Sequence, residues 1–414
     1  MRDRNENRPG YKKTKAGWIP AEWNCIPLEE VACVQTGLAK NNKRNQKNPI
    51  ELPYLRVANV QDNFLDLREI KTIEVEKSVV ERSLLKYGDV LLTEGGDFDK
   101  LGRGTIWKNE IAPCLHQNHI FAVRCKKDEL NSYFLAALSS SNFGRRYFIL
   151  SSKQSTNLAS INSTQLKKFS LPLPKLTEQQ KITTILSTWD TAISQTRKLI
   201  DVKTRRKKAL THQLLFGKVR LVGFQDSWKD FFLGDLFFER KETNGDHLPL
   251  LAITGKRGII LASGIDRKDS SNTDKSKYKR IAPGDIGYNT MRMWQGVSAV
   301  SDLEGIVSPA YTICRPKETV NVLFMGYLFK FPSVIHSFWR HSQGLVSDTW
   351  NLKFHHFAQI RVKIPDVREQ KAIASFLTAV DNEIKSHESN LTTIEKQKRG
   401  LMQKLLTGEV RVNT

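Results

Sequence analysis

A long segment of this chain occurs twice, and this repeat constrains the fold more than any other feature. Residues 171–221 and 362–412 align without a gap at an offset of 191 residues, and 14 of the 51 aligned positions are identical. Unrelated segments of this length would share about three identities, at roughly 6% chance identity. The chain therefore folds as two related halves. The identities include Pro174/Pro365, Glu178/Glu369, Gln179/Gln370, Asp190/Asp381, Leu214/Leu405, Leu215/Leu406, Gly217/Gly408 and Arg220/Arg411.

Short anchors extend the repeat upstream, although most of the sequence between them differs. These anchors are Leu52–Val57 with Leu248–Ile253, Gly88–Val90 with Gly284–Ile286, and Trp23 and Leu28 with Trp228 and Leu233. The chain therefore consists of a variable region and a shared segment, followed by a second variable region and a second shared segment.

Each shared segment has the pattern of one long helix. A proline precedes each copy, Gly400 is the only glycine or proline in either interior, and Gly217 and Gly408 suit C-terminal stops. Thr177 with Gln180, and Asp366 with Glu369, have the spacing of capping boxes. A helix of about 40 residues is roughly 60 Å long at 1.5 Å per residue.

Both helices carry apolar residues at heptad spacing, in the same frame, and both become polar near the same point. Such stripes favour packing against each other as an intramolecular coiled coil. The alternative is two separate amphipathic helices, each on its own domain. The frame is Ile182, Leu186, Trp189, Ile193, Thr196, Ile200, Lys203, Lys207, Leu210 and Leu214 in the first copy. In the second it is Ile373, Leu377, Val380, Ile384, His387, Leu391, Ile394, Lys398, Leu401 and Leu405.

The variable regions alternate short β-like runs with turn residues, and each contains one helical stretch, 133–138 and 323–331. We therefore predict an α+β chain with two mixed α/β domains and an internal two-fold pseudo-repeat. The expected boundaries are 1–175 and 218–365 for the two domains, 176–217 for the central helix, and 366–414 for the C-terminal helix and tail. The predicted strands are 54–60, 89–93, 104–107, 119–124, 248–254, 285–289, 297–300 and 310–314.

The charge points to a polyanionic partner. The chain has 65 Lys and Arg against 43 Asp and Glu, a formal net charge of +22. Nucleic acid is the leading candidate, and a basic surface without a specific ligand is the alternative. No apolar run reaches the ~20 residues of a membrane span, and the N-terminal residues lack the apolar core of a secretory signal. Five cysteines without a CxxC pair favour reduced thiols in a cytoplasm.

Motifs for catalysis are scarce. The sequence has no Walker A motif, no dinucleotide fingerprint, and no methyl-donor or amino-methylating loop. Asp366, Glu383 and Lys385 match a loose metal-dependent nuclease pattern but lie on one predicted helix. Cys114, His116, His119 and Cys125 fit no standard zinc spacing, and strand alternation would send them to opposite faces. We therefore predict no catalytic residue and no metal site.

Polar loops supply the candidate DNA contacts. Two turns follow the matched Gly-Asp strands, at 93–103 and 290–295, and share almost no sequence. Arg and Gln suit guanine and adenine edges, whereas Lys and Arg in basic loops suit phosphates. A solvated loop without a ligand is the alternative for each. Candidates for base contacts are Arg103, Arg292 and Gln295; candidates for phosphate contacts are Lys43, Arg44, Lys47, Lys277 and Lys279.

The combination of features resembles the specificity subunit of type I restriction–modification systems. It rests on P-x(3)-E-Q followed by a long heptad helix ending L-L-x-G-x-V-R, found at 174–220 and again at 365–411. The resemblance implies two target-recognition domains that each read half of a bipartite site in double-stranded DNA. It also implies that the two helices pack antiparallel as a spacer.

The same resemblance implies that chemistry belongs to partners. Two methyltransferase subunits would dock on the chain, bind S-adenosylmethionine and methylate adenine, and restriction subunits would cleave DNA using ATP. S-adenosylmethionine, ATP and Mg are therefore expected on partner subunits, with none bound by this chain. The alternatives are a self-contained sequence-specific nuclease or methyltransferase, and a basic coiled-coil scaffold that binds nucleic acid without sequence preference.

Overall fold

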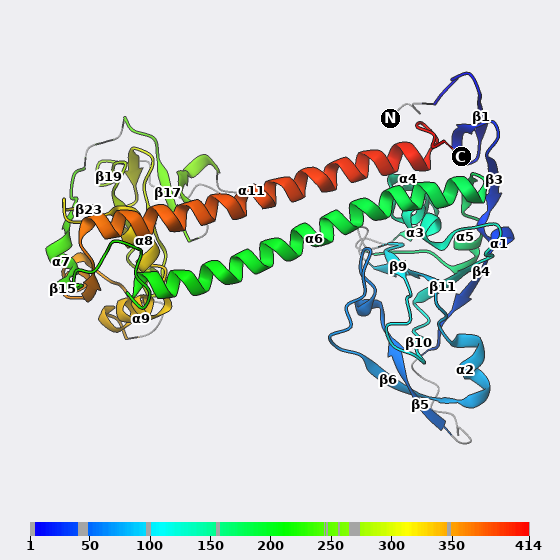
Figure 1. Cartoon of the computed structure of the whole chain (residues 1–414), viewed down its shortest axis with the longest axis horizontal. Helices are drawn as coiled ribbons and strands as arrows, with labels where there is room; N and C mark the ends of the chain where they lie inside the picture. The colour runs from blue at the N-terminus through cyan, green and yellow to red at the C-terminus, as the bar shows by residue number, and fades with distance from the viewer. Residues whose placement is uncertain are drawn as a thin grey trace. The chain divides into compact units, whose positions relative to one another are not determined.

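The computed structural model describes residues 5–39, 49–96, 101–154, 158–243, 245, 247–255, 257–264, 274–345 and 349–413. The chain forms two compact units, which we call unit 1 and unit 2 (Figure 1). Unit 1 contains Met1–Arg197 and Asn390–Thr414, and unit 2 contains Lys198–Ser389. Each unit thus combines a variable region with segments of both long helices. The predicted domain boundaries separate the helices from the variable regions, and they remain a prediction.

Unit 1 is built on a four-stranded antiparallel sheet with the order β4-β11-β7-β9. Alternate residues of β7 enter different cores: Val90 and Leu92 pack with the helices, whereas Leu91 packs on the other face beside Trp107 and Cys114. Both faces are covered, so β7 is buried throughout. The strands are β1 (Tyr11–Thr14), β2 (Gly17–Pro20), β3 (Asn24–Pro27), β4 (Ala32–Thr36), β5 (Pro49–Leu55), β6 (Lys71–Glu76), β7 (Val90–Thr93), β8 (Gly95–Gly96), β9 (Gly104–Ile106), β10 (Leu115–His116), β11 (Ile120–Cys125), β12 (Lys153–Gln154), β13 (Ala159–Ser160) and β14 (Ser170–Leu173).

Unit 2 repeats this plan. Its four-stranded sheet has the order β16-β23-β20-β21, and β15 pairs with β24 as β3 pairs with β14. Matching sheet orders confirm two mixed domains with an internal repeat. The strands are β15 (Lys229–Phe232), β16 (Phe237–Glu239), β17 (Leu251–Thr254), β18 (Gly258–Leu261), β19 (Lys279–Ile281), β20 (Ile286–Asn289), β21 (Ser298–Val300), β22 (Gly305–Val307), β23 (Tyr311–Pro316) and β24 (Arg361–Ile364).

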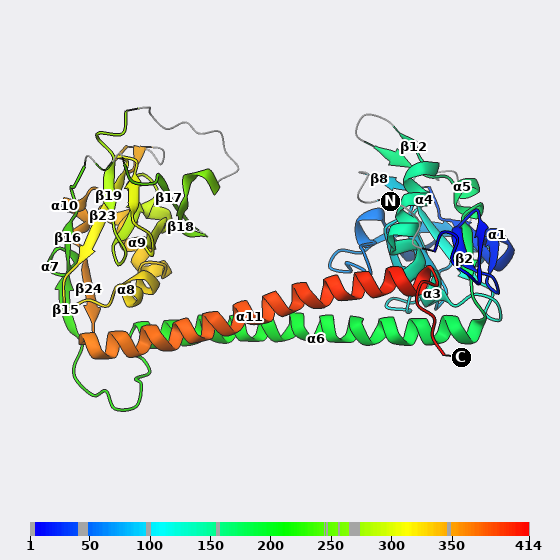
Figure 2. The same cartoon turned by 90° about the horizontal axis from the view of Figure 1, so that it is seen from above.

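The helices follow the same repeat. In unit 1, α3 packs beside the C-terminal part of α11, and Phe134, Leu405 and Leu406 share one core (Figure 2). No helix among the described residues combines the length and apolar character needed to cross a membrane. The helices are α1 (Leu28–Val31), α2 (Lys77–Ser83), α3 (Ser132–Ser140), α4 (Asn142–Ser151), α5 (Ser163–Lys167), α6 (Leu176–Leu215), α7 (Leu233–Leu236), α8 (Val322–Leu328), α9 (Pro332–His341), α10 (Phe354–Phe357) and α11 (Val367–Leu406); η1 (Val57–Asn59), η3 (Ala262–Gly264) and η4 (Met293–Gln295) are 3-10 turns.

The two long helices, α6 and α11, confirm the predicted length but correct the predicted caps. Each helix has 40 residues and is followed by a glycine at positive φ, Gly217 or Gly408. Asp366 caps α11, since its Oδ1 accepts from the N–H of Arg368 at 2.7 Å. The predicted capping box at Thr177 is wrong, because α6 already begins at Leu176 and Thr177 lies inside the helix. The box at Asp366 is half right, because the Glu369 carboxylate binds elsewhere.

The Glu and Arg of the repeated motifs meet across the two copies in a cluster that we call the clamp. In unit 2, Glu369 at the start of α11 accepts from Arg220 Nε at 2.6 Å and Nη2 at 2.7 Å, and from Trp228 Nε1 at 3.2 Å. In unit 1, Glu178 accepts from Arg411 at 2.6 and 2.8 Å and from Trp23 at 3.1 Å. The carboxylate raises the pKa of each arginine through these hydrogen bonds. In each unit, therefore, the glutamate of one copy of the motif binds the arginine of the other copy.

The repeated glutamines join each long helix to its own variable region. Gln179 accepts from the N–H of Asn131 at 2.8 Å and donates to the carbonyl of Pro174 at 3.0 Å. Gln370 makes the same bonds to Asn321 and Pro365 at 2.8 and 2.9 Å. The two asparagines cap α3 and α8. The side-chain amide of each glutamine therefore links the start of its long helix to the start of α3 or α8.

Other repeated residues pair the long helices within each unit. In unit 1, Lys398 Nζ lies 2.5 Å from Asp190 Oδ1, and in unit 2 Lys207 pairs with Asp381. These are the two copies of one Lys and one Asp, so a single pattern serves both units. All positions of the predicted heptad frame are buried or half-buried. In both units, residues later in α6 pair with residues earlier in α11.

Candidate nucleic-acid interface

The matched Gly-Asp turns lock the start of β7 and β20. Asp89 accepts from the N–H of Lys86 at 2.8 Å and from Arg124 at 2.8 and 2.7 Å. Asp285 likewise accepts from the N–H of Ala282 and from Arg240, both at 2.8 Å. Arg124 lies on β11, whereas Arg240 follows β16. The equivalent aspartates of the two units therefore bind arginines from strands that are not equivalent. This bracing positions the loops that leave the far ends of β7 and β20.

The loop after β7 carries Arg103. The N–H of Thr93 donates to the Arg103 carbonyl at 2.9 Å, and Gly102, at a φ of +64°, packs against Phe148. The side chain of Arg103 is half-buried, and its Nε is buried without a hydrogen-bond partner among the described residues. A buried N–H without a partner is rare in folded proteins and fits a donor that awaits a ligand or water. Residues 97–100 of this loop lie outside the described residues.

The loop after β20 carries Arg292 and Gln295 on the exposed side of η4. Met293 in the same turn is fully buried, and Gly296 closes the turn at a φ of +75° with Ile335 against it. The Lys330 ammonium donates to the carbonyls of Gly296 and Ser298 at 2.8 and 2.5 Å, and burial lowers its pKa. The turn is thus held rigidly while its two polar side chains face solvent.

A group of tryptophans supports this turn. Trp294 donates its indole N–H to the Met291 carbonyl at 2.9 Å and meets Trp350 edge to face, with ring centroids 5.1 Å apart. Trp339 of α9 lies 5.9 Å from Trp350 and is 41% exposed. Rigid aromatic surface beside Arg and Gln suits contact with DNA bases. The group has no signal in the sequence, because α9 and η4 are distant along the chain.

The phosphate candidates differ in their surroundings. Lys277 is exposed. The Lys279 ammonium donates to the Tyr311 carbonyl at 2.8 Å and lies 3.8 Å from Glu239, so it already has partners. Lys43, Arg44 and Lys47 lie outside the described residues.

The residues considered for zinc do not form a ligand set. Burial raises the pKa of the Cys114 and Cys125 thiols to about 12. Burial lowers the pKa of His116 to about 4, and its Nδ1 lies 2.9 Å from the Ile120 carbonyl. His119 instead pairs with Glu94 at 2.5 Å. No group of three His, Cys, Asp or Glu within the described residues could hold a metal ion.

The nuclease pattern also lacks a converging site. Glu383 pairs with Lys203 at 2.6 Å, and Asp366 caps α11 at its first turn. Both lie along one helix axis, whereas metal-dependent cleavage needs carboxylates that converge on an ion. All five cysteines lie in the described part of the chain and are free thiols.

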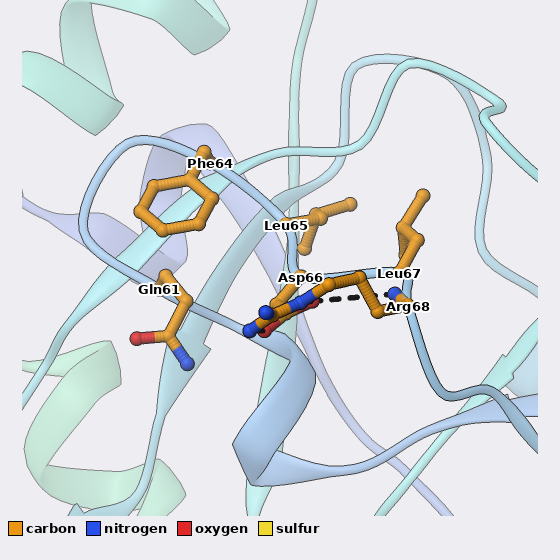
Figure 3. Close-up of a pocket in the computed structure, with 6 residues that line it drawn as sticks. All are labelled: Gln61, Phe64, Leu65, Asp66, Leu67 and Arg68. Carbon is orange, nitrogen blue, oxygen red and sulfur yellow. Dashed lines mark hydrogen bonds and ion pairs between the residues drawn. The ribbon is translucent and has the colours of Figure 1, made fainter. Parts of the chain in front are cut away.

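An open hollow of about 660 Å³ lies in unit 1, lined by Gln61, Phe64, Leu65, Asp66, Leu67 and Arg68 (Figure 3). Its charged residues satisfy each other, because Arg68 Nη2 lies 2.6 Å from Asp66 Oδ2. All six residues come from one surface loop, so the hollow does not have the enclosed form of a cofactor site.

Comparison with known proteins identifies the family. The model of the type I restriction modification DNA specificity domain matches residues 20–203 and again residues 225–396. A Methanocaldococcus jannaschii protein named as the MjaX type I restriction enzyme specificity subunit is 26% identical, over 98% of this chain and 97% of its own. The MjaVIII specificity subunit of the same organism is 24% identical, over 97% and 96%.

Solved structures share the fold. The HsdS subunit of Thermoanaerobacter tengcongensis has a TM-score of 0.51 and 15% identity, over 95% of this chain and 98% of its own. The type I S subunit of M. genitalium has a TM-score of 0.53 and 12% identity, over 95% and 97%. A chain from a type I R-M system described for its complex assembly has a TM-score of 0.57 and 15% identity, over 95% and 99%. With two matched specificity domains, the chain belongs to the family of type I restriction–modification DNA specificity subunits.

Proposed function

We propose that the chain selects a bipartite site in double-stranded DNA, with unit 1 and unit 2 each reading one half. The observation that carries this proposal is that the two units have the same sheet topology but different loops after the matched strands. The strands β7 and β20 and their Asp turns match, yet one is followed by the Arg103 loop and the other by η4 with Arg292. A shared scaffold with different reading loops is what two recognition domains of different specificity need.

In this proposal α6 and α11 form an antiparallel coiled coil that sets the spacing of the two half-sites. Support comes from the heptad frame, whose positions are buried or half-buried, and from four ion pairs between the helices. These pairs join Asp190 to Lys398, Arg197 to Glu395, Lys203 to Glu383 and Lys207 to Asp381.

The chemistry of the complex would belong to partner subunits. Two methyltransferase subunits would dock on this chain and bring S-adenosylmethionine, and restriction subunits would bring ATP and Mg. The role of this chain is then to bind and orient DNA for adenine methylation. Asp366 serves as a helix cap and Glu383 as an ion-pair partner, which is compatible with this role.

Methylome sequencing tests this proposal. A host that expresses the chain with its cognate methyltransferase subunit should carry adenine methylation at one bipartite motif. Exchange of residues 1–170 for the corresponding region of a relative should change one half of that motif and leave the other half intact. The purified chain alone should transfer no methyl group, and transfer by it, or a simultaneous change of both halves, would contradict the proposal.

Single substitutions should separate base contacts from phosphate contacts. We expect Arg292→Ala to cost ~1–3 kcal/mol of binding free energy and to relax specificity at one base pair. Lys277→Ala should instead weaken binding to all duplexes alike and reduce the salt dependence by about one ion. Competition binding of the full chain to duplexes that differ at single positions, at several salt concentrations, measures both effects. A uniform loss for Arg292→Ala would assign Arg292 to the phosphate class.

A further inference from the structure

Unit 1 has a surface loop without a counterpart among the residues that the structure describes in unit 2. The segment Gln61–Arg68, which we call the Phe64 loop, lies between η1 and β6. In unit 2 the related hairpin pairs β17 with β18, and Thr254 at the end of β17 pairs with Gly258 at the start of β18. Within the described part of the chain, the Phe64 loop is therefore an element of unit 1 alone.

The buried carboxamide of Asn59 braces this loop. Its Oδ1 accepts from the N–H of Arg56 at 2.8 Å, and its Nδ2 donates to the carbonyls of Asp66 and Glu69 at 2.8 and 2.9 Å. The N–H of Asp66 returns a bond to the Asn59 carbonyl at 2.8 Å. A single amide thus fixes both ends of the loop, which reduces the entropy lost if the loop binds a ligand.

Apolar side chains anchor the same loop to the protein. Leu65 and Leu67 pack against the core around Leu55, Trp107 and Ile120. Phe64 does not join them and is 57% exposed. Figure 3 shows its ring on the opposite side of the loop from Leu65, beside Gln61. A braced loop that packs its leucines, partly buried, against the core and leaves its aromatic ring in water offers that ring to a partner.

The position of the loop indicates which partner. The N–H of Asn63 donates to the Gly104 carbonyl at 3.0 Å, so Phe64 lies next to the strand that follows Arg103. Asp62 pairs with Arg145 at 3.1 Å, and the Arg68 side chain is 90% exposed. The Phe64 loop is thus hydrogen-bonded to the residue that directly follows Arg103, the arginine whose buried Nε lacks a partner among the described residues. Arginine and an aromatic ring on one edge are suited to base edges and to base faces or thymine methyl groups.

We propose that Phe64 is a specificity-determining residue that contacts a DNA base in the half-site read by unit 1. This inference rests on the proposed function of the chain. The rigid ring contacts a base next to the one reached by Arg103, and the half-site of unit 1 has a base preference that no equivalent residue of unit 2 provides.

Selection of DNA by the full chain tests this inference. Purified wild type, Phe64→Ala, Phe64→Trp and Tyr87→Ala each select duplexes from a randomised pool, and affinities are then measured on the wild-type site. Phe64→Ala should lose about 5–150-fold in affinity and relax the preference at one step of one half-site. Phe64→Trp should retain that preference. Tyr87→Ala is the matched control, because Tyr87 is an exposed aromatic residue of unit 1, at 63% exposure.

The outcomes separate this inference from the proposed function. Phe64 is exposed, so thermal unfolding of Phe64→Ala should match that of Tyr87→Ala. A wild-type chain that selects a bipartite site which Phe64→Ala selects with equal affinity would overturn only the role of Phe64. A Phe64→Ala chain whose base preference relaxes equally in both half-sites would also overturn it. So would an equal loss of affinity in Tyr87→Ala. A wild-type chain that selects no sequence would overturn the proposed function and this inference with it.

Discussion

Glu369→Ala should lower the stability of unit 2 by about 2–4 kcal/mol, one of the two largest effects that we expect. The carboxylate of Glu369 is buried, with a side-chain exposure of 1%, and it accepts from both Arg220 and Trp228. Its removal leaves the Trp228 indole N–H without its acceptor and, among the described residues, leaves the Arg220 guanidinium with only the Asp226 carbonyl, at 2.9 Å. Because Arg220 is 26% exposed, water can solvate part of its charge, so the loss should stay below that of a fully buried pair.

Calorimetric unfolding measures this loss, because it can resolve the transition of one unit from that of the other. For a unit of this size the transition should fall by roughly 5–15 °C. Arg368→Ala is the matched control, since Arg368 is one residue away and pairs with Asp226 at 3.9 Å with both side chains largely exposed. It should change stability by less than about 1 kcal/mol. Equal effects of the two substitutions would show that the clamp does not stabilise unit 2.

Insertion of one heptad into both long helices should switch the DNA spacer to a longer length. Insertions after Arg197 in α6 and after Ser389 in α11 leave the Asp190–Lys398 and Lys207–Asp381 pairs in register. Seven residues add ~10 Å at 1.5 Å per residue, which corresponds to about three base pairs. The added base pairs also rotate the second half-site by about 100°. The preferred spacer should therefore grow by ~2–4 base pairs, within what twist and bending of DNA allow.

Methylome sequencing of a host that carries the lengthened chain and its methyltransferase subunit measures the new spacer. The bases of both half-sites should stay the same, because the reading loops are unchanged. Insertion into α6 alone is the control. It lengthens one helix but not the other, so the Asp190–Lys398 and Lys207–Asp381 pairs cannot both form, and it should abolish methylation. A chain with both insertions that still methylates only the original spacer would show that the helices do not set the distance.

The repeat and the long helices could be predicted from the sequence because they depend on local patterns. Identity at a fixed offset is visible along the chain, and heptad spacing places side chains on one helix face whatever surrounds them. Both helices have the expected length and end before the predicted glycines. The cap at Thr177 was wrong because capping depends on where the helix begins, and α6 begins at Leu176.

The candidate interface was less accessible to sequence reasoning. The turns after β7 and β20 were found because each follows a matched Gly-Asp pair. The Phe64 loop could not be recognised from the sequence. Its residues have the composition of an ordinary polar loop, and the bonds from Asn59 that brace it are visible only in the structure. The tryptophan group was also missed, since Trp294, Trp339 and Trp350 meet only after η4 and α9 pack together.

By itself, the sequence determined the two-fold repeat, the two long helices, the mixed α/β class and the membership of the specificity-subunit family. Only the tertiary structure decided how the repeated motifs are used. Spacing could not reveal that Glu178 meets Arg411 and that Glu369 meets Arg220. Nor could it reveal that Asp89 binds Arg124 of β11 whereas Asp285 binds Arg240 beside β16. Helix periodicity is a property of neighbouring residues, whereas these contacts join residues far apart in the chain and exist only once the separate elements have packed.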